Sequence, residues 1–253
     1  MGRVRLPDFI IGGAPRSGTT WLYHLLERHP DVHMAQPVRP EPKFFLIDAE
    51  YARGLDYYST RWFAGVDRSR AGEKSTDYLE SAAAAERIAA SLPDVRLVFI
   101  LREPASRAVS NYAWSRMNGL EHLELAEALR QEPAREAAYP EAQRYSRPHS
   151  YFSRGLYADL LAPYLRLLSR ERVLVLEYED IEANPLRLAH GLWDFLEVEP
   201  RPADIDGLGI INPSEEYAAD PAVMASLRRR YEGPNRDLEA LLGQRFEAWG
   251  HTS

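Results

Sequence analysis

The amino-acid sequence predicts an α/β fold, a single domain in which helices flank a central, mainly parallel sheet. Three apolar runs, at residues 9–11, 96–101 and 173–176, have the length and composition of buried strands. A segment with helical spacing or a helix-start signal follows each run. Strands that alternate with helices favour a parallel sheet with right-handed crossovers. The chain has 253 residues, within the range of one α/β domain, so we expect one domain over residues 1–253.

The N-terminal part of the chain begins this alternation. Apolar residues at helical spacing follow the first strand and predict a helix that ends near His29. Residues 31–35 could form a short second strand. Residues 36–45 include three prolines, which exclude a regular helix, so we expect a loop there. Residues 49–63 are rich in aromatic side chains that could pack in the core or line a substrate cleft.

The middle of the chain adds further elements. Residues 72–78 predict a short strand and a turn, and the Ala-rich residues 81–92 have a high helix propensity. Pro104 fits the first turn of a helix over residues 104–117. Residues 119–150 are charged and loop-like, with a helix expected near residues 123–131. We interpret this segment as a candidate lid or an acceptor-facing insertion.

The C-terminal part of the chain predicts four more helices. Residues 155–169 have an amphipathic pattern, and an Asn-Pro pair opens a helix over residues 184–196. Residues 199–220 are rich in Pro and Asp and predict a loop. Two short helices, over residues 222–231 and 235–242, are expected to follow it.

The composition excludes several classes of protein. A net charge of −7 argues against broad affinity for nucleic acids. The absence of Cys excludes disulfides, thiolate chemistry and Cys-based metal sites, and it fits a reducing compartment. No apolar run has the length of a membrane span, and the N-terminus has no signal-peptide pattern. We therefore expect a cytoplasmic protein with no nucleic-acid partner and no membrane span; the sequence makes no prediction about its oligomeric state.

A Gly-rich loop joins the first strand to the first helix. It reads Gly12-Gly13-Ala14-Pro15-Arg16-Ser17-Gly18-Thr19-Thr20. Backbone N–H groups in such a loop converge on a ligand, and the helix N-terminus favours negative charge there. The hydroxyls of Thr19 and Thr20 add donors. The arrangement predicts an anion site, and an ordinary β–α turn without a ligand is the alternative.

This loop is close to a P-loop but departs from it at one position. Gly13 and Gly18 have the P-loop spacing. Thr19 stands where a P-loop has the Lys that binds the β- and γ-phosphates. The nearby cation is Arg16, within the loop. The loop therefore suits a phosphate-like group, while the usual triphosphate–Mg²⁺ apparatus is incomplete.

Charged residues near other strand ends are further candidates. Glu41 and Lys43 lie on the Pro-rich loop after the expected second strand, where α/β folds place ligand groups. The alternative is that both are solvated surface charges. Arg102 follows the strand over residues 96–101, and Ser110 lies about two turns into the next helix. Their alternatives are a salt bridge from Arg102 to a neighbouring Glu and a hydroxyl bonded to the helix backbone.

Three of these segments together resemble the sulfotransferases that use 3′-phosphoadenosine 5′-phosphosulfate (PAPS). The resemblance extends over roughly residues 8–196 and is closest to the heparan-sulfate sulfotransferase branch and its bacterial relatives. The segments are the Gly-rich loop, the pair Arg102 and Ser110, and Glu41-Pro42-Lys43-Phe44-Phe45 together with Glu73-Lys74-Ser75. One loop alone is weak evidence, but three segments in the right order are specific.

The resemblance implies a role for each of these residues. The loop would bind the 5′-phosphosulfate, Arg102 and Ser110 would bind the 3′-phosphate, Glu41 would be the base, and Lys74 would assist at the sulfonate. The implied catalytic residues are Glu41, Lys74 and Arg16. The implied nucleotide-binding residues are Ala14, Pro15, Arg16, Ser17, Gly18, Thr19, Thr20, Arg102 and Ser110.

The sequence also departs from that branch near its C-terminus. Without Cys, the chain lacks the disulfide hairpin of the heparan-sulfate enzymes. Residues 199–220 contain no clear equivalent of the basic, Gly-containing loop that covers the 3′-phosphate in those enzymes.

The resemblance implies an enzyme that transfers the sulfonate of PAPS to a hydroxyl, with 3′-phosphoadenosine 5′-phosphate (PAP) as the product. The acceptor would be a small molecule, a carbohydrate or a natural product, and the scheme needs no metal. His24, His29 and His33 are close in sequence but show no metal-site pattern. Two alternatives are a P-loop-type kinase, which the missing Lys disfavours, and a non-catalytic nucleotide-binding module, which would need Glu41 or Lys74 to point away from the site.

Overall fold

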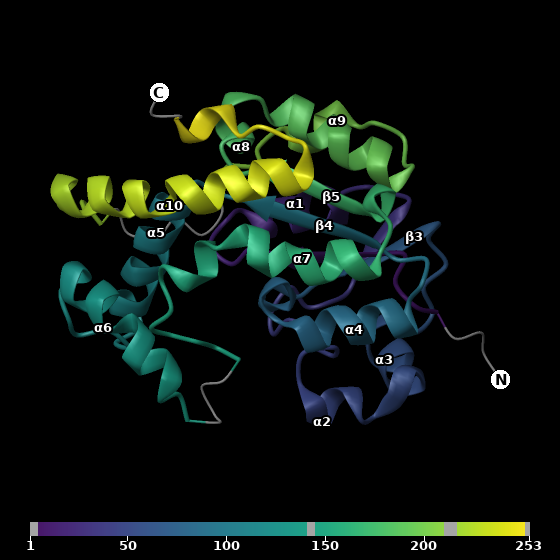
Figure 1. Cartoon of the computed structure of the whole chain (residues 1–253). Coiled ribbons are helices and arrows are strands. Elements are labelled where there is room, and N and C mark those ends of the chain that lie inside the picture. The colour runs from purple at the N-terminus through teal and green to yellow at the C-terminus, as the bar shows by residue number, and fades with distance from the viewer. Residues whose placement is uncertain (1–4, 141–144, 210–216, 251–253) are drawn as a thin grey trace. The chain divides into compact units, whose positions relative to one another are not determined.

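The structure, a computed structural model, describes residues 5–140, 145–209 and 217–250. Its contacts divide the chain into two compact units. The first unit comprises Met1–Leu101 and Pro163–Ile211, and the second comprises Arg102–Ala162 and Asn212–Ser253. The helix α7 (Tyr157–Leu167) begins in the second unit and ends in the first. Figure 1 labels the elements.

The first unit contains a five-stranded sheet in the order β2-β3-β1-β4-β5, in which every pairing is parallel. The strands are β1 (Phe9–Gly13), β2 (Val32–Met34), β3 (Arg70–Lys74), β4 (Arg96–Leu101) and β5 (Val173–Glu177). The predicted α/β class with a parallel sheet is therefore confirmed. Because β1 pairs with both β3 and β4, its carboxyl end lies at the centre of one edge of the sheet.

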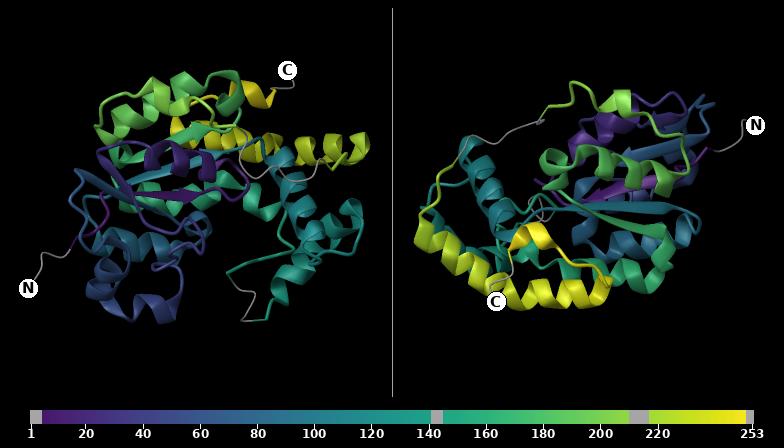
Figure 2. Two further views of the ribbon diagram at one scale, coloured as in Figure 1. Left: turned by 180° about the vertical axis from the view of Figure 1, so that it is seen from behind. Right: turned by 90° about the horizontal axis from the view of Figure 1, so that it is seen from above.

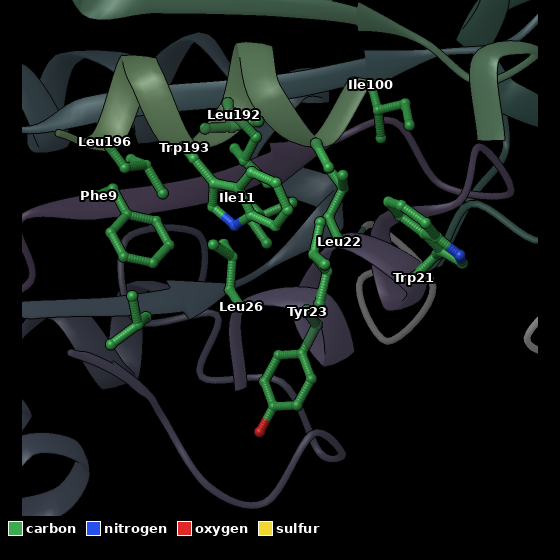
Figure 3. Packing of buried hydrophobic residues seen from close by; sticks show 14 of the residues in the cluster. Phe9, Ile11, Trp21, Leu22, Tyr23, Leu26, Ile100, Leu192, Trp193 and Leu196 are labelled. Carbon is green, nitrogen blue, oxygen red and sulfur yellow. The ribbon is translucent and has the colours of Figure 1, made fainter. Parts of the chain in front are cut away.

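One face of this sheet packs against the helices α1 (Thr19–Glu27) and α9 (Pro185–Leu196). Figure 3 shows the contact, with Trp193 of α9 among the side chains of β1 and α1. The labelled residues are Phe9, Ile11, Trp21, Leu22, Tyr23, Leu26, Ile100, Leu192, Trp193 and Leu196. Burial of a side chain of this size contributes roughly 1.5–3 kcal/mol. This packing holds α1 against the sheet and so fixes the loop that precedes it.

The other face of the sheet carries α4 (Ala82–Ser91) and the C-terminal part of α7. Figure 1 and the left view of Figure 2 place α4 and α9 on opposite sides of the sheet. Phe99 of β4 meets Tyr164 of α7 edge-on, with ring centroids 5.1 Å apart. The Tyr164 hydroxyl donates to the backbone carbonyl of Tyr78, which ties α7 to the short helix η1 (Thr76–Glu80) that follows β3.

The aromatic segment after the Pro-rich loop forms α2 (Asp48–Tyr51) and α3 (Gly54–Phe63), which the sequence did not predict as helices. The sequence left open whether its aromatic side chains pack in the core or line a cleft. Tyr58 and Phe63 are buried and pack in the core. Tyr58 stacks on Phe44, with ring centroids 4.4 Å apart. The remaining short elements of the unit are η4 (Arg170–Arg172), α8 (Asp180–Ala183) and η5 (Pro202–Ile205).

The second unit is helical. Its elements are α5 (Pro104–Met117), α6 (Leu125–Ala137), η3 (Ser153–Gly155), α10 (Pro221–Leu242), η6 (Glu247–Trp249) and the start of α7. Three tyrosines meet in its core: Tyr112 on α5, Tyr151 just before η3, and Tyr231 on α10. Two buried carboxylates, Glu121 and Glu132, accept hydrogen bonds from backbone N–H groups at residues 122–123 and 152–153 in the described part of the segment between α5 and α7. Its interpretation as a lid or insertion stays a prediction.

The predicted pair of C-terminal helices, over residues 222–231 and 235–242, is wrong. A single helix, α10, continues through Pro234. Its buried residues Leu227, Tyr231, Leu238 and Leu242 recur at spacings of four, seven and four, so they share one face of the helix. Burial of this stripe outweighs the hydrogen bond that Pro234 cannot donate. The sequence suggested a break because proline is a local signal, whereas burial of the stripe is a tertiary effect.

Candidate active site

The Gly-rich loop connects β1 to α1 at the carboxyl edge of the sheet. Gly18 is the N-cap of α1 with φ of 85°, in the left-handed region that favours glycine, and no side chain caps this helix. A Cβ on Gly18 would lie 2.5 Å from the end of the Ile181 side chain and 2.9 Å from the Tyr178 ring, so those side chains would have to shift to accommodate it. The first N–H groups of an uncapped helix lack intrahelical acceptors. They are suited to bind an anion at this end of α1.

Ser17, in the same loop, has a buried side chain. The residue is fully buried, and its hydroxyl has no hydrogen-bond partner among the described residues. A buried polar group without a partner is unfavourable by about 1–3 kcal/mol. Arg16, beside Ser17, has φ of 67°, a conformation that non-glycine residues adopt mainly at constrained positions.

Sheet register places Lys74 beside this loop. Lys74, the last residue of β3, pairs in register with Ile11 of β1, and the next N–H, that of Ser75, donates to the Ile11 carbonyl at 3.1 Å. The Lys74 side chain is only 2% exposed. An ammonium so far from water needs an anionic partner.

Glu41 is that partner. The Lys74 ammonium forms an ion pair with Glu41 Oε1, and the Glu41 side chain is 11% exposed. Glu41 Oε2 accepts a hydrogen bond from the Thr76 N–H at 3.0 Å and one from the Thr76 hydroxyl at 3.2 Å. The two residues that were predicted to be catalytic from separate segments are therefore in contact. Sequence reasoning missed Thr76, although its position just after Lys74 was a usable signal.

Lys43, on the same loop as Glu41, has a different partner. Its ammonium pairs with Asp77, the residue after Thr76. The two ion pairs, Glu41 with Lys74 and Lys43 with Asp77, join the Pro-rich loop to the segment that follows β3. They show that neither Glu41 nor Lys43 is an ordinary solvated surface charge.

Behind the ion pairs lies a carboxyl group that the sequence did not single out. Glu73 is fully buried and accepts hydrogen bonds from the hydroxyls of Tyr58 at 2.8 Å, Tyr78 at 3.0 Å and Ser75 at 2.6 Å. Burial raises the pKa of Glu73 to about 7, although these three hydrogen bonds act in the opposite direction. The position of Glu73 next to Lys74 was visible in the sequence. Its burial depends on α3 and η1, which fold over it.

Arg102 and Ser110 belong to the second unit. The Arg102 carbonyl accepts a hydrogen bond from the Tyr157 hydroxyl at 2.9 Å, and Arg102 is half-buried. Ser110 is buried on α5, whose N-terminus is capped by Glu103. Their assignment to the 3′-phosphate stays a prediction.

Metal and membrane features were searched over the part of the chain that the structure describes. No group of three or more His, Asp or Glu side chains in it could hold a metal ion. No helix in the same residues combines the length and apolar character needed to cross a membrane.

Comparison with known proteins identifies the family. A family model described as a sulfotransferase domain matches residues 6–208. Human heparan sulfate glucosamine 3-O-sulfotransferase 6 is 32% identical over 197 residues, which cover 77% of this chain and 53% of that protein. Mouse heparan sulfate glucosamine 3-O-sulfotransferase 3A1 is 30% identical over 195 residues, covering 77% of this chain and 47% of that protein. The chain spans about half the length of these curated relatives.

Solved structures agree with this result. A sulfotransferase from Alicyclobacillus acidocaldarius matches with a TM-score of 0.80 at 26% identity, covering 97% of this chain and 99% of that one. Mouse sulfotransferase SULT7A1 complexed with PAP matches with a TM-score of 0.52 at 17% identity, covering 81% of this chain and 63% of that one, a likeness of fold alone. The family model and the 32% identical relative both cover most of the sequence, so this chain belongs to the sulfotransferase family, as the resemblance predicted.

Proposed function

We propose that this chain transfers the sulfonate of PAPS to a hydroxyl of a carbohydrate or other small-molecule acceptor and releases PAP. The observation that carries the proposal is the ion pair between Glu41 and Lys74 at the edge of the sheet where the Gly-rich loop begins. A hydroxyl nucleophile must lose a proton and a phosphosulfate must be stabilised as it breaks. A carboxylate and an ammonium in contact suit these two tasks.

The chemistry is an in-line displacement at sulfur. The acceptor oxygen forms a bond to the sulfur while the bond from sulfur to the bridging oxygen breaks, and its electron pair stays with the 5′-phosphate of PAP. Glu41 takes the proton of the acceptor hydroxyl. Lys74 stabilises the negative charge that develops on the bridging oxygen and the sulfonate. By analogy with phosphoryl transfer, most of the catalysis comes from positioning and electrostatics.

The nucleotide ends would be held by different residues. The N–H groups at the start of α1, the Ser17 hydroxyl and the Thr19 and Thr20 hydroxyls would bind the 5′-phosphosulfate, with Arg16 as the local cation. The orphan hydroxyl of Ser17 supports this part of the proposal. Arg102 would bind the 3′-phosphate through a charge-assisted, forked contact, helped by Ser110. The family resemblance alone supports that second part.

The names of two relatives support a hydroxyl acceptor. The human and mouse relatives are named as 3-O-sulfotransferases of heparan sulfate glucosamine, so oxygen is their acceptor atom. The family match favours sulfonate over phosphate transfer and so disfavours the kinase alternative. The contact between Glu41 and Lys74 disfavours the non-catalytic alternative, which required one of them to point away.

The test is an assay of the full chain with radiolabelled PAPS. The acceptor panel would include glucosamine-containing oligosaccharides, simple sugars, phenols and aliphatic alcohols, with EDTA present. We expect label on an acceptor hydroxyl, equimolar PAP, and loss of both products in Glu41→Gln. The absence of transfer to every acceptor, or a transfer from ATP with Mg²⁺ to the same acceptors, would overturn the proposal.

A further inference from the structure

Glu73 is a buried acid that the proposed reaction does not use. It is the residue before Lys74, and none of its surface is exposed. All three of its hydrogen-bond donors are hydroxyls, from Tyr58, Tyr78 and Ser75. An ionised carboxylate can only accept hydrogen bonds. In its ionised form Glu73 therefore directs the three hydroxyl hydrogens toward itself and leaves the oxygen lone pairs facing outward.

Two of these hydroxyls use their lone pairs to hold the backbone of the Pro-rich loop. Ser75 Oγ accepts the Lys43 N–H at 2.8 Å, and the Tyr78 hydroxyl accepts the Phe45 N–H at 3.2 Å. The third hydroxyl, that of Tyr58, donates to Glu73, and the Tyr58 ring stacks on Phe44. A single hydroxyl thus links Glu73 to each of two backbone N–H groups, those of Lys43 and Phe45, which lie within four residues of Glu41.

The loop residue that Ser75 holds has an unfavourable backbone conformation. Lys43 has φ of 47°, in the left-handed region that a lysine seldom adopts. Such a conformation persists only where the surroundings determine it. The hydrogen bond at its N–H and the buried rings of Phe44 and Phe45 supply those constraints. Glu41 lies two residues earlier, across Pro42, so a change at Lys43 would move the carboxylate.

We propose that Glu73 is a positioning residue that holds the loop of residues 41–45 through Ser75 and Tyr78, and so sets Glu41 against Lys74. The proposal rests on the proposed function, because the residue that Glu73 positions, Glu41, is the base of that reaction. The unfavourable burial of Glu73, which raises its pKa, supports a role beyond packing. An apolar residue would fill the same space without desolvating a charge, but it could not orient the two hydroxyls.

The test compares three variants that each remove one hydroxyl donor from Glu73. Ser75→Ala and Tyr78→Phe also remove the acceptor of a loop N–H, whereas the control, Tyr58→Phe, keeps its ring on Phe44 and leaves the loop N–H groups bonded. Hydrogen exchange is measured in the full chain on a peptide that covers residues 41–46. The kcat for sulfonate transfer and the melting temperature are measured alongside, with the shift in melting temperature caused by PAP. Glu73→Gln is included as the direct variant.

We expect faster exchange in residues 41–46 for Ser75→Ala, Tyr78→Phe and Glu73→Gln, and wild-type exchange for Tyr58→Phe. In the first three variants kcat should fall by about 10- to 100-fold, the size of effect that a displacement of about 1 Å produces. PAP should stabilise all four variants as it does the wild type, because none of them alters residues 12–20. The melting temperature of Tyr58→Phe should fall about as much as that of Ser75→Ala, while its kcat stays at the wild-type value.

Unchanged exchange in Ser75→Ala and Tyr78→Phe would overturn the proposal whatever the activity. Equal losses of kcat in all three hydroxyl variants would also overturn it, because they would show a general effect of the buried cluster. Faster exchange in residues 41–46 together with a wild-type kcat in these variants would show that the loop does not affect catalysis, and it would overturn the positioning role. If the wild type transfers no sulfonate, the proposed function fails, while the exchange data still decide whether Glu73 holds the loop.

Discussion

The Glu41 carboxylate and the Lys74 ammonium form an ion pair across 33 positions of sequence. With side chains 11% and 2% exposed, both charges are largely removed from water. Removal of one partner from a buried pair leaves the other charge uncompensated, which is more damaging than loss of the pair itself. Variants of this pair should therefore change stability as well as chemistry, and the two effects have to be measured separately.

Glu41→Gln should lower kcat by about 10²–10⁴, because it removes the proposed base while keeping the shape of the side chain. It should also destabilise the protein by roughly 3–5 kcal/mol, since the buried Lys74 loses its anionic partner. Steady-state kinetics at saturating PAPS and urea unfolding measure the two quantities.

The matched control for Glu41 is Glu121→Gln, which breaks another ion pair with a buried carboxylate, that with Arg135 in the second unit. This control should lose stability and retain most of its kcat. If Glu41→Gln keeps more than about a tenth of the wild-type kcat, Glu41 is not the base, because base catalysis contributes at least about 10².

Gly18→Ala should destabilise the protein and abolish the stabilisation by PAP. A Cβ there would lie 2.5 Å from the end of the Ile181 side chain and 2.9 Å from the Tyr178 ring, so we expect a shift at the start of α1, where the proposed anion site lies. Gly54→Ala is the control, since Gly54 has nearly the same φ, 83° against 85°, but no atom within 4 Å of a Cβ. Melting scans of both variants with and without PAP measure the difference. Equal PAP shifts in the two variants would contradict the placement of the anion site at Gly18.

Arg102→Ala should weaken PAP binding by roughly 1.5–3 kcal/mol, the strength of a hydrogen bond to a charged group. ADP, which lacks a 3′-phosphate, should bind the variant and the wild type equally. Calorimetric titration with both nucleotides tests this selectivity, and Arg130→Ala, whose side chain is 71% exposed, is the control. Equal losses for PAP and ADP would show that Arg102 does not recognise the 3′-phosphate.

Glu121 should make the stability depend on pH in the acid range. Burial alone would raise the pKa of Glu121, but hydrogen bonds from Arg135, Tyr151 and the Leu123 N–H outweigh it and lower the pKa from 4.5 to about 2. A carboxyl with a lowered pKa binds its proton more readily in the unfolded chain. Its stabilisation is therefore present above about pH 4.5 and disappears as the pH falls toward 2.

Glu121→Gln should accordingly flatten the loss of stability between pH 4.5 and 2, measured as urea midpoints across that range. The control is Glu197→Gln, which alters a carboxylate that is 60% exposed and pairs with Arg70 and Arg96. It should leave the curve nearly unchanged, since exposed ion pairs contribute only about 0–1 kcal/mol. If Glu121→Gln loses stability between pH 4.5 and 2 as the wild type does, Glu121 is not the cause of that loss.

Features that depend on neighbouring residues could be predicted from the sequence alone. The strand Arg96–Leu101 and the helix Pro104–Met117 have the predicted bounds, because an apolar run and a proline at a first turn act within a few residues. The Gly-rich loop is also a local pattern, since the backbone conformation of Gly18 depends on the absence of its own side chain. The family followed from such patterns in the right order.

The tertiary structure decided which charges meet and which groups are buried. Nothing in the local sequence of Glu41 specifies Lys74 as its partner; the parallel pairing of β3 with β1 brings Lys74 to the loop edge. Nothing local distinguishes Glu73 from a surface glutamate, because its burial comes from Tyr58 on α3 and Tyr78 on η1. The continuity of α10 through Pro234 likewise depends on burial of its apolar stripe. In each case the deciding free energy, desolvation or packing, arises between residues that only the folded chain brings into contact.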